Sequence, residues 1–542
     1  MNLSPDPAPA PTAPDRADGT SAADGLRPAP DAPRRRAREL RLLLALIWPG
    51  QLLVVAGIVA ANAQPQIAQH FHTTQIAWFG LAFTLATIVA TPFAVRLGEV
   101  HGKRRVMLVL AAAGLVGDLI TVLAPNYPVM VLGRVVAGLY GPVAVLVLAA
   151  VRDLFPPRRV AVALGTVAGS VGVLALVTPL LSGWLLDAFG WRGALWFLVG
   201  STVVALLTLL CVPETPRRAA AGRLDRPGAV LLGGGLALVV FAVGRGRDLG
   251  WTSAGVTVPL AAGAAVLVAF TVLELRVAHP ILDLRMLRRR PVATVLVGSS
   301  IPQAAYFASQ SILIFLALFP AIPHVSDGLG WSTTYVAVLG IPGGLVTFGA
   351  GIGVGHLVRA VSPRTVWYAG LALLTAGLVL AAFHHRDASQ IVGTGVLTGL
   401  GGGILMAGQQ TMIVSVVSPE EQAAANGMSS LLTQVCLTLT TQFLYTLLSG
   451  GSTVLDGTAF YRDEAFTDAY LGMAAIVALG LLVSLAIPSL RRAQGTAAQG
   501  TAAQGTAAQG TAAQGTAAQD TGSGPSGEPG RPLKDTRTTT DA

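Results

Sequence analysis

The chain has 542 residues, of which 53% are hydrophobic and 12% are charged, and its mean hydropathy is +0.64. A soluble protein of this length needs more polar surface, so the composition predicts an all-α integral membrane protein. The net charge of +9 does not indicate a nucleic-acid partner, because the arginines lie in loops between apolar stretches. Cys211 and Cys436 lie inside such stretches, and we expect no disulfide, metal or cofactor.

Fourteen apolar stretches have roughly the 20 residues that are needed to cross a bilayer. They cover residues 42–64, 76–97, 105–125, 128–150, 160–185, 193–212, 228–244, 255–275, 292–319, 334–358, 366–383, 391–416, 427–449 and 469–488. Residues 1–40 are rich in Pro, Ala and Asp, and residues 489–542 carry Ala-Gln-Gly-Thr-Ala repeats. Neither segment can bury a core, so both are predicted to be disordered tails. The first stretch begins too late and is too long for a cleavable signal peptide.

Basic residues alternate between the two sides of the predicted spans. Loops after even-numbered stretches carry about seventeen Arg and Lys residues, and loops after odd-numbered stretches carry about five. This asymmetry predicts that both termini are cytoplasmic and that the chain is a multi-pass protein of the inner (plasma) membrane.

Three short motifs carry a family resemblance. The run Gly98-Glu99-Val100-His101-Gly102-Lys103-Arg104-Arg105 resembles the hallmark cytoplasmic loop of the major facilitator superfamily, with Glu99 where the family has Asp. Arg134-Val135-Val136-Ala137-Gly138 resembles the family's Arg-x-x-x-Gly motif. Gly165 with Thr178-Pro179-Leu180-Leu181-Ser182-Gly183 resembles its antiporter motif. With the span count, their order resembles the fourteen-span drug:proton antiporter branch over residues 42–488.

The resemblance implies a major facilitator fold with 14 transmembrane helices in two pseudo-symmetric bundles. Residues 41–212 and 291–488 would form the six-helix bundles, and residues 213–290 an inserted two-helix hairpin with its cytoplasmic linkers. It assigns an inner gate to Gly98, Glu99, Gly102, Lys103, Arg104 and Arg105, and an outer gate to Gly165, Thr178, Pro179, Ser182 and Gly183. Topology anchoring by the cations and simple helix packing by the glycines remain alternatives.

Two ionisable residues fall inside apolar stretches, where a charge is costly. Arg134 belongs to a motif that the family links to proton coupling, and Asp118 is expected near the middle of the third stretch. Asp118 either titrates with transport or only accepts hydrogen bonds. The first stretch reads Ala56-Gly57-Ile58 where the fourteen-span branch has a carboxylate, so Asp118 or Glu99 takes over that role, or coupling differs. The missing charge favours neutral or anionic cargo.

Uncharged polar residues recur at helical spacing and are candidates for cargo binding. They are Gln303, Tyr306 and Gln310 in the ninth stretch, Gln434, Thr438 and Gln442 in the thirteenth, and Asn62, Gln64, Tyr140, Gln409 and Gln410 elsewhere. Hydrogen bonding between helices explains the same pattern equally well. Acidic Glu420 and Glu421 are expected to pair with Arg359 or Arg364.

Together these features predict a monomeric secondary transporter, not an enzyme, that exports amphipathic drugs or antibiotics across the lipid bilayer in exchange for protons. One alternative is an uptake carrier or uniporter of a small organic solute that uses no proton. The other is a transporter-like membrane sensor, against which the lack of long soluble stretches argues.

Overall fold

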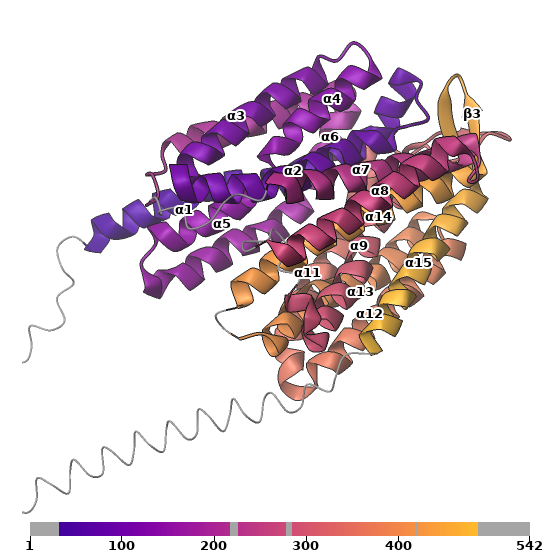
Figure 1. Cartoon of the computed structure of the whole chain (residues 1–542). Coiled ribbons are helices and arrows are strands. Elements are labelled where there is room, and N and C mark those ends of the chain that lie inside the picture. Colours follow the sequence, from indigo (N-terminus) through magenta and orange to yellow (C-terminus); the bar gives the residue numbers. More distant parts are fainter. Residues whose placement is uncertain (1–31, 217–225, 278–284, 419–420, 486–542) are drawn as a thin grey trace, which may run out of the picture.

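The computed structural model describes residues 32–216, 226–277, 285–418 and 421–485, and these residues are almost entirely helical (Figure 1). The helices are α1 (Ala32–Phe71), α2 (Ala77–His101), α3 (Lys103–Val122), α4 (Tyr127–Ala137), η2 (Gly138–Tyr140), α5 (Val143–Leu154), α6 (Pro157–Leu210), α7 (Arg226–Leu249), α8 (Ala254–Arg276), η3 (Met286–Arg288), α9 (Arg290–Leu318), α10 (Thr333–Leu339), α11 (Ile341–Ala360), α12 (Pro363–Phe383), α13 (Ala388–Val416), α14 (Gln422–Leu448), η4 (Ser449–Gly451) and α15 (Asp463–Leu485). Since α1 begins at Ala32, the end of the segment that was expected to be disordered is helical. The rest of the predicted tails, 1–31 and 486–542, lies outside the described residues.

Thirteen described helices are long and apolar enough to cross a membrane. One of them, α6, has 54 residues and is broken at Gly190, where φ is 67° and ψ is −175°. Contacts with α1 show that the chain reverses there, because neighbouring residues Trp48 and Gln51 bond to Ser201 and Val167 on opposite sides of the break. With α6 broken into two arms at Gly190, the count of membrane-length helices comes close to the fourteen spans expected from the sequence.

The two ends of the helix array carry different connections. The loops near Lys103 and Arg289 lie at what we call the basic end. The opposite hairpin end carries two antiparallel ribbons, β1 (Ala321–Ile322) with β2 (Ser326–Asp327), and β3 (Ser452–Leu455) with β4 (Thr458–Tyr461). Asp456 and Gly457 both have positive φ, 47° and 74°, as the tight turn of a two-residue hairpin requires.

We call α1 to α6 the first bundle and α9 to α15 the second (Figure 1), because the helices of each group pack mainly against one another. The short α10 is the exception, since it packs mainly against α6. The α7–α8 hairpin lies outside both, with α7 packed against α2 of the first bundle and α14 of the second. Glycines allow these contacts: a Cβ at Gly233 would lie 1.9 Å from Val89, and one at Gly244 would lie 3.0 Å from Gln442. The hairpin therefore contacts both bundles along one helix.

Hydrogen bonds between described residues join the two bundles at the hairpin end. The Asp187 carboxylate of α6 accepts the backbone N–H groups of Thr333 and Thr334 at 2.9 and 2.8 Å, at the start of α10. The Tyr445 hydroxyl donates to Gln64 between α14 and α1, and Thr458 donates to the carbonyl of Ala68. This conformation is therefore closed by hydrogen bonds at the hairpin end.

Replacing Asp187 is expected to loosen this closure. Asp187→Ala removes an ionised acceptor from two N–H groups of the other bundle, and such hydrogen bonds are stronger than neutral ones. A reporter cysteine at buried Ala63, in a background lacking Cys211 and Cys436, should then react about 5-fold faster with a membrane-impermeant maleimide. The control Glu464→Ala removes an exposed carboxylate from the same end and should leave the rate unchanged. Equal maleimide reaction rates in the reporter protein and in its Asp187→Ala and Glu464→Ala variants would contradict the role of Asp187 in closing the hairpin end.

Candidate functional site: a buried charged cluster between α3, α4 and α6

Helices α3 and α4 approach each other closely because glycines face their contact. A Cβ at Gly117 would lie 2.1 Å from the backbone nitrogen of Ala137, and one at Gly133 would lie 2.5 Å from Oγ1 of Thr121. No other residue leaves room for backbone at these distances. The close approach places Asp118 of α3 beside the α4 helix that carries Arg134.

Asp118 and Arg134 are both buried, with 2% and 1% of their surface exposed. Oδ2 of Asp118 accepts a hydrogen bond from the Thr202 hydroxyl at 2.9 Å. Nε of Arg134 donates to the carbonyl of Phe79 at 3.2 Å, and the guanidinium carbon lies 4.8 and 4.5 Å from the ring centres of Phe79 and Phe83. The described part of the chain offers no hydrogen-bond partner to Nη1 of Arg134.

The two charges attract each other, and the Tyr140 side chain of η2 interacts with both. Asp118 bonds to Thr202, and Nε of Arg134 bonds to the Phe79 carbonyl. The carboxylate can therefore gain or lose a proton without breaking a direct bond to the arginine. A buried carboxylate with a cation nearby is the arrangement that proton-translocating membrane proteins use. Tyr140, predicted as a cargo residue, belongs to this cluster and is buried, with 1% of its surface exposed.

The depth of Asp118 differs from the sequence-based expectation. The third stretch was taken to run to residue 125, with Asp118 near its middle, but α3 ends at Val122. Asp118 therefore lies about 6 Å of helical rise from the hairpin end of α3. The hydropathy pattern extended too far because the apolar Leu123 and Ala124 continue past the helix end.

The predicted inner-gate residues are held within the first bundle. Glu99 pairs with Arg96 at 2.8 Å, and Lys103 pairs with Asp153 and donates to the carbonyl of Ala149 at 3.1 Å. These contacts join the α2–α3 turn to α5.

Beyond α5, the same turn is fixed to the end of α6. Arg104 donates to the carbonyls of Leu209 and Leu210, and Glu214 accepts its backbone N–H and lies 3.7 Å from Arg105. At Gly102 φ is 96°, and a Cβ there would lie 2.4 Å from Glu214, so the turn requires glycine. At Gly98 a Cβ would lie 2.9 Å from Leu146.

The predicted outer-gate residues separate into two places. Thr178, Ser182 and Gly183 lie toward the hairpin end with Pro179, and a Cβ at Gly183 would lie 2.9 Å from the backbone of Thr333 in α10. Gly165 lies nearer the basic end, where a Cβ would meet nothing within 4 Å. Only the part of the motif near the hairpin end touches the second bundle.

The predicted cargo residues do not form one site in this conformation. Asn62 donates to Ser182 at 3.3 Å, and Gln64 bonds to Tyr445. Nε2 of Gln409 donates to Ser299 and Ser429 at 3.1 and 2.8 Å, which ties α13 to α9 and α14. These bonds are the interhelical kind that the sequence left as an alternative.

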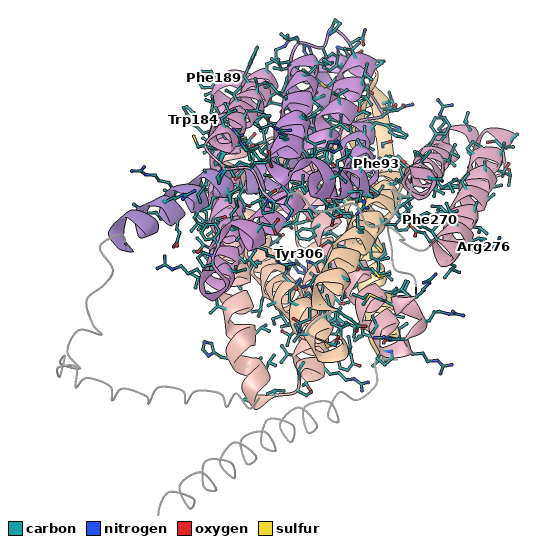
Figure 2. All side chains as sticks on the ribbon, turned by 60° about the vertical axis from the view of Figure 1, so that its left-hand side comes forward. Phe93, Trp184, Phe189, Phe270, Arg276 and Tyr306 are labelled. Carbon is teal, nitrogen blue, oxygen red and sulfur yellow. The ribbon has the colours of Figure 1, made fainter. Side chains whose placement is uncertain are left out.

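The α9 stripe contains one polar atom without a described partner and one exposed amide side chain. Gln303 is 8% exposed, and its Oε1 has no partner among the described residues. The ring of Tyr306 occupies the space beside Gly402 of α13, where a Cβ would lie 2.4 Å from it, near the centre of the molecule (Figure 2). Gln310 is exposed, as is Phe307, whose ring centre lies 5.5 Å from that of Tyr306 with the ring planes tilted by 51°. Phe307 was not singled out from the sequence because phenylalanine is unremarkable in an apolar span.

The remaining predicted residues are scattered. Gln410 is exposed, Gln434 is partly buried, and the Thr438 hydroxyl donates to the Gln434 carbonyl within α14. Gln442, from the same stripe, faces Gly244 of α7. The Gln442 end of the α14 stripe therefore lies against the inserted hairpin.

The expected partner of Glu421 was wrong. Its carboxylate accepts from Nη1 of Arg289 at 3.0 and 2.9 Å, because η3 precedes α9 beside the start of α14. The hydrogen bond from Arg289 holds the pKa of Glu421 below its usual value. Glu420 lies outside the described residues. At the hairpin end, Asp463 bonds to Arg386 at 2.7 Å and raises the pKa of that guanidinium.

The sequence profile described as "Major Facilitator Superfamily" matches residues 48–434 and again 305–514. The chain belongs to this superfamily. The chain is therefore a multi-pass membrane transporter and not an enzyme, and the family and fold that the sequence predicted are confirmed.

Curated relatives match this superfamily member over most of the chain. It is 27% identical over 415 residues to a probable actinorhodin transporter of Streptomyces coelicolor, covering 72% of this chain and 69% of that protein. It is 28% identical to the cephamycin export protein CmcT of Amycolatopsis lactamdurans, covering 78% and 87%. It is 29% identical to the puromycin resistance protein pur8 of Streptomyces alboniger, covering 76% and 82%.

Solved structures share the fold. A POT family transporter in complex with 5-aminolevulinic acid superposes with a TM-score of 0.60 at 13% identity, covering 84% of this chain and 96% of that one. A partially occluded inward open conformation of the xylose transporter XylE from E. coli gives 0.53 at 11% identity, covering 83% and 97%.

Proposed function

We propose that this transporter exports amphipathic small molecules, antibiotics among them, in exchange for protons. The observation that carries the proposal is the buried Asp118, which lies beside Arg134 and yet bonds to Thr202. An antiporter needs one group that can be charged or neutral inside the bundle, and Asp118 has the environment for it. The drug-export names of its relatives support the direction of transport.

The proposed cycle follows from where the bundles are joined. With the hairpin-end hydrogen bonds made, cargo enters from the basic end; breaking them lets the bundles rock and exposes the same site to the other side. We assign the basic end and both termini to the cytoplasm, because its loops carry most of the cations. The transporter then lies in the plasma membrane and works as a monomer.

The test is proton movement in proteoliposomes that contain a pH-sensitive dye. We expect puromycin, chloramphenicol or ethidium, added one at a time, to trigger proton flux that protein-free liposomes do not show. Flux of cargo with no proton movement would overturn the antiporter proposal. It would favour the second candidate, a carrier without proton coupling.

That second candidate rests on α1. Ala56, Gly57 and Ile58 occupy the part of this helix in which the resembling branch has a carboxylate, so a cationic cargo finds no counter-charge there. The uncharged polar residues around Gln303 and Tyr306 suit neutral cargo in either case.

Replacing Tyr306 should change which compounds are transported. Its ring lies beside that of exposed Phe307 and fills the space beside Gly402, so Tyr306→Ala removes an apolar surface next to Gln303. Uptake into inverted vesicles should change by about 10-fold for some compounds and little for others. Tyr306→Phe keeps the ring and should preserve the order of preference. A uniform loss that follows the amount of protein would assign Tyr306 a packing role only.

A further inference from the structure

Thr202 lies in the second arm of α6, opposite Asp118 of α3, and 1% of its surface is exposed. Its Oγ1 is 2.9 Å from Oδ2 of Asp118 and 3.0 Å from the carbonyl oxygen of Leu198, one turn earlier in its own helix. A hydroxyl has one hydrogen to donate, so it can serve only one of these two acceptors at a time.

The protonation state of Asp118 determines which acceptor the hydroxyl serves. An ionised carboxylate only accepts, so the Thr202 hydrogen points to Oδ2 in a charge-assisted bond. A protonated Asp118 has its own O–H, which donates to Oγ1 of Thr202. The Thr202 hydrogen is then free to turn to the Leu198 carbonyl, the bond that threonines in helices commonly make.

Among the described neighbours of Asp118, Thr202 is the residue whose side chain donates a hydrogen bond to the carboxylate. The charged or titratable described groups that interact with Asp118 are Arg134 on α4 and Tyr140 on η2, and α6 faces it with the Thr202 hydroxyl. Arg134 donates to the Phe79 carbonyl instead of to the carboxylate. Thr121, also buried and one turn from Asp118 on α3, donates to the carbonyl of Gly117 at 2.7 Å.

We propose that Thr202 is the positioning residue of the proton carrier, donating to ionised Asp118 and turning to the Leu198 carbonyl when Asp118 is protonated. The proton that Asp118 takes up stays on the carboxyl group, and no other proton moves between residues. Each protonation of Asp118 on α3 thereby changes the hydrogen bond that Thr202 makes on α6. This inference rests on the proposed role of Asp118 as the carrier.

The test follows the carboxyl group itself and needs no cargo. Infrared spectra of the full-length protein in lipid, recorded between pH 4 and pH 10, should contain a protonated-carboxyl C=O band that Asp118→Asn lacks. Thr202→Val keeps the shape of the side chain and removes the hydroxyl. The ionised carboxylate then loses a stronger bond than the protonated acid does, so the midpoint of the band should move toward alkaline pH by about 0.5 to 1 unit.

Two variants separate this role from general packing. Thr202→Ser restores the hydroxyl and should return the midpoint to that of the original protein. Thr121→Val removes a buried hydroxyl from the same neighbourhood and should not move it. An unchanged midpoint in Thr202→Val, or an equal shift in Thr121→Val, would overturn the inference. Failure of the proposed function is a separate result: full proton-driven transport by Asp118→Asn.

Discussion

Asp118→Asn is expected to abolish proton-coupled transport and to leave cargo binding intact. Asparagine has the same shape and its amide oxygen can still accept from Thr202, but it cannot release a proton. Cargo-triggered proton flux in proteoliposomes should fall by about 10-fold or more. Coupling between two bound ligands typically changes an affinity by about 5- to 150-fold, and the variant loses this coupling. Binding of the same compound, measured by tryptophan fluorescence, should change by less than about 3-fold.

Glu99→Gln is the matched control for this experiment. The sequence left Glu99 as a second candidate carrier, but its carboxylate pairs with Arg96 at the basic end of α2 and is part of no buried cluster. The variant should therefore keep proton flux. If Glu99→Gln loses the flux and Asp118→Asn keeps it, the two residues exchange roles and the site proposed between α3, α4 and α6 is wrong.

Gly117→Ala is expected to destabilise the first bundle severely. The added Cβ would lie 2.1 Å from the backbone nitrogen of Ala137 and 2.7 Å from its Cα, and backbone cannot rotate away as a side chain can. Helices α3 and α4 must separate, at a cost of about 1–3 kcal/mol or more. The thermal midpoint in detergent should fall by several degrees, and Arg134 should move away from Asp118.

Gly349→Ala makes the same substitution where space is available. A Cβ at Gly349 of α11 meets nothing within 4 Å, and alanine favours a helix over glycine by about 1 kcal/mol. Its thermal midpoint should therefore stay level or rise. A similar fall in both variants would mean that backbone entropy and not helix contact governs the effect at Gly117.

The helical fold and the positions of most membrane-length segments could be predicted because length and hydropathy alone decide which segments can cross a bilayer. The direction in which each polar side chain points could not. In a soluble helix the polar face marks the outside, but a membrane helix is apolar toward both lipid and its neighbours. Gln409 and Gln410 show the difficulty: they are adjacent and chemically identical, yet one bonds to two serines and the other is exposed.

Contacts between residues that lie far apart in the sequence could not be predicted either. Asp118 and Arg134 were singled out because charges are rare in apolar spans, but nothing near residue 118 indicates Thr202, which lies 84 positions away. Threonine is common in such helices, so its presence is no signal. The same holds for Glu421, whose partner Arg289 lies 132 positions earlier, while Arg359 and Arg364 are nearer in sequence.

The α7–α8 hairpin makes the two flanks of the molecule unequal. On one flank it covers the line where α2 and α14 face each other, and Figure 2 shows Phe270 and Arg276 of this hairpin standing outside the bundles. On the other flank α6 and α11 meet near Leu176 and Gly344, where α7 and α8 make no comparable contact among the described residues. A lipid molecule beside this transporter therefore meets α7 and α8 on one flank and the contact between α6 and α11 on the other, so the protein presents two unlike surfaces to the bilayer.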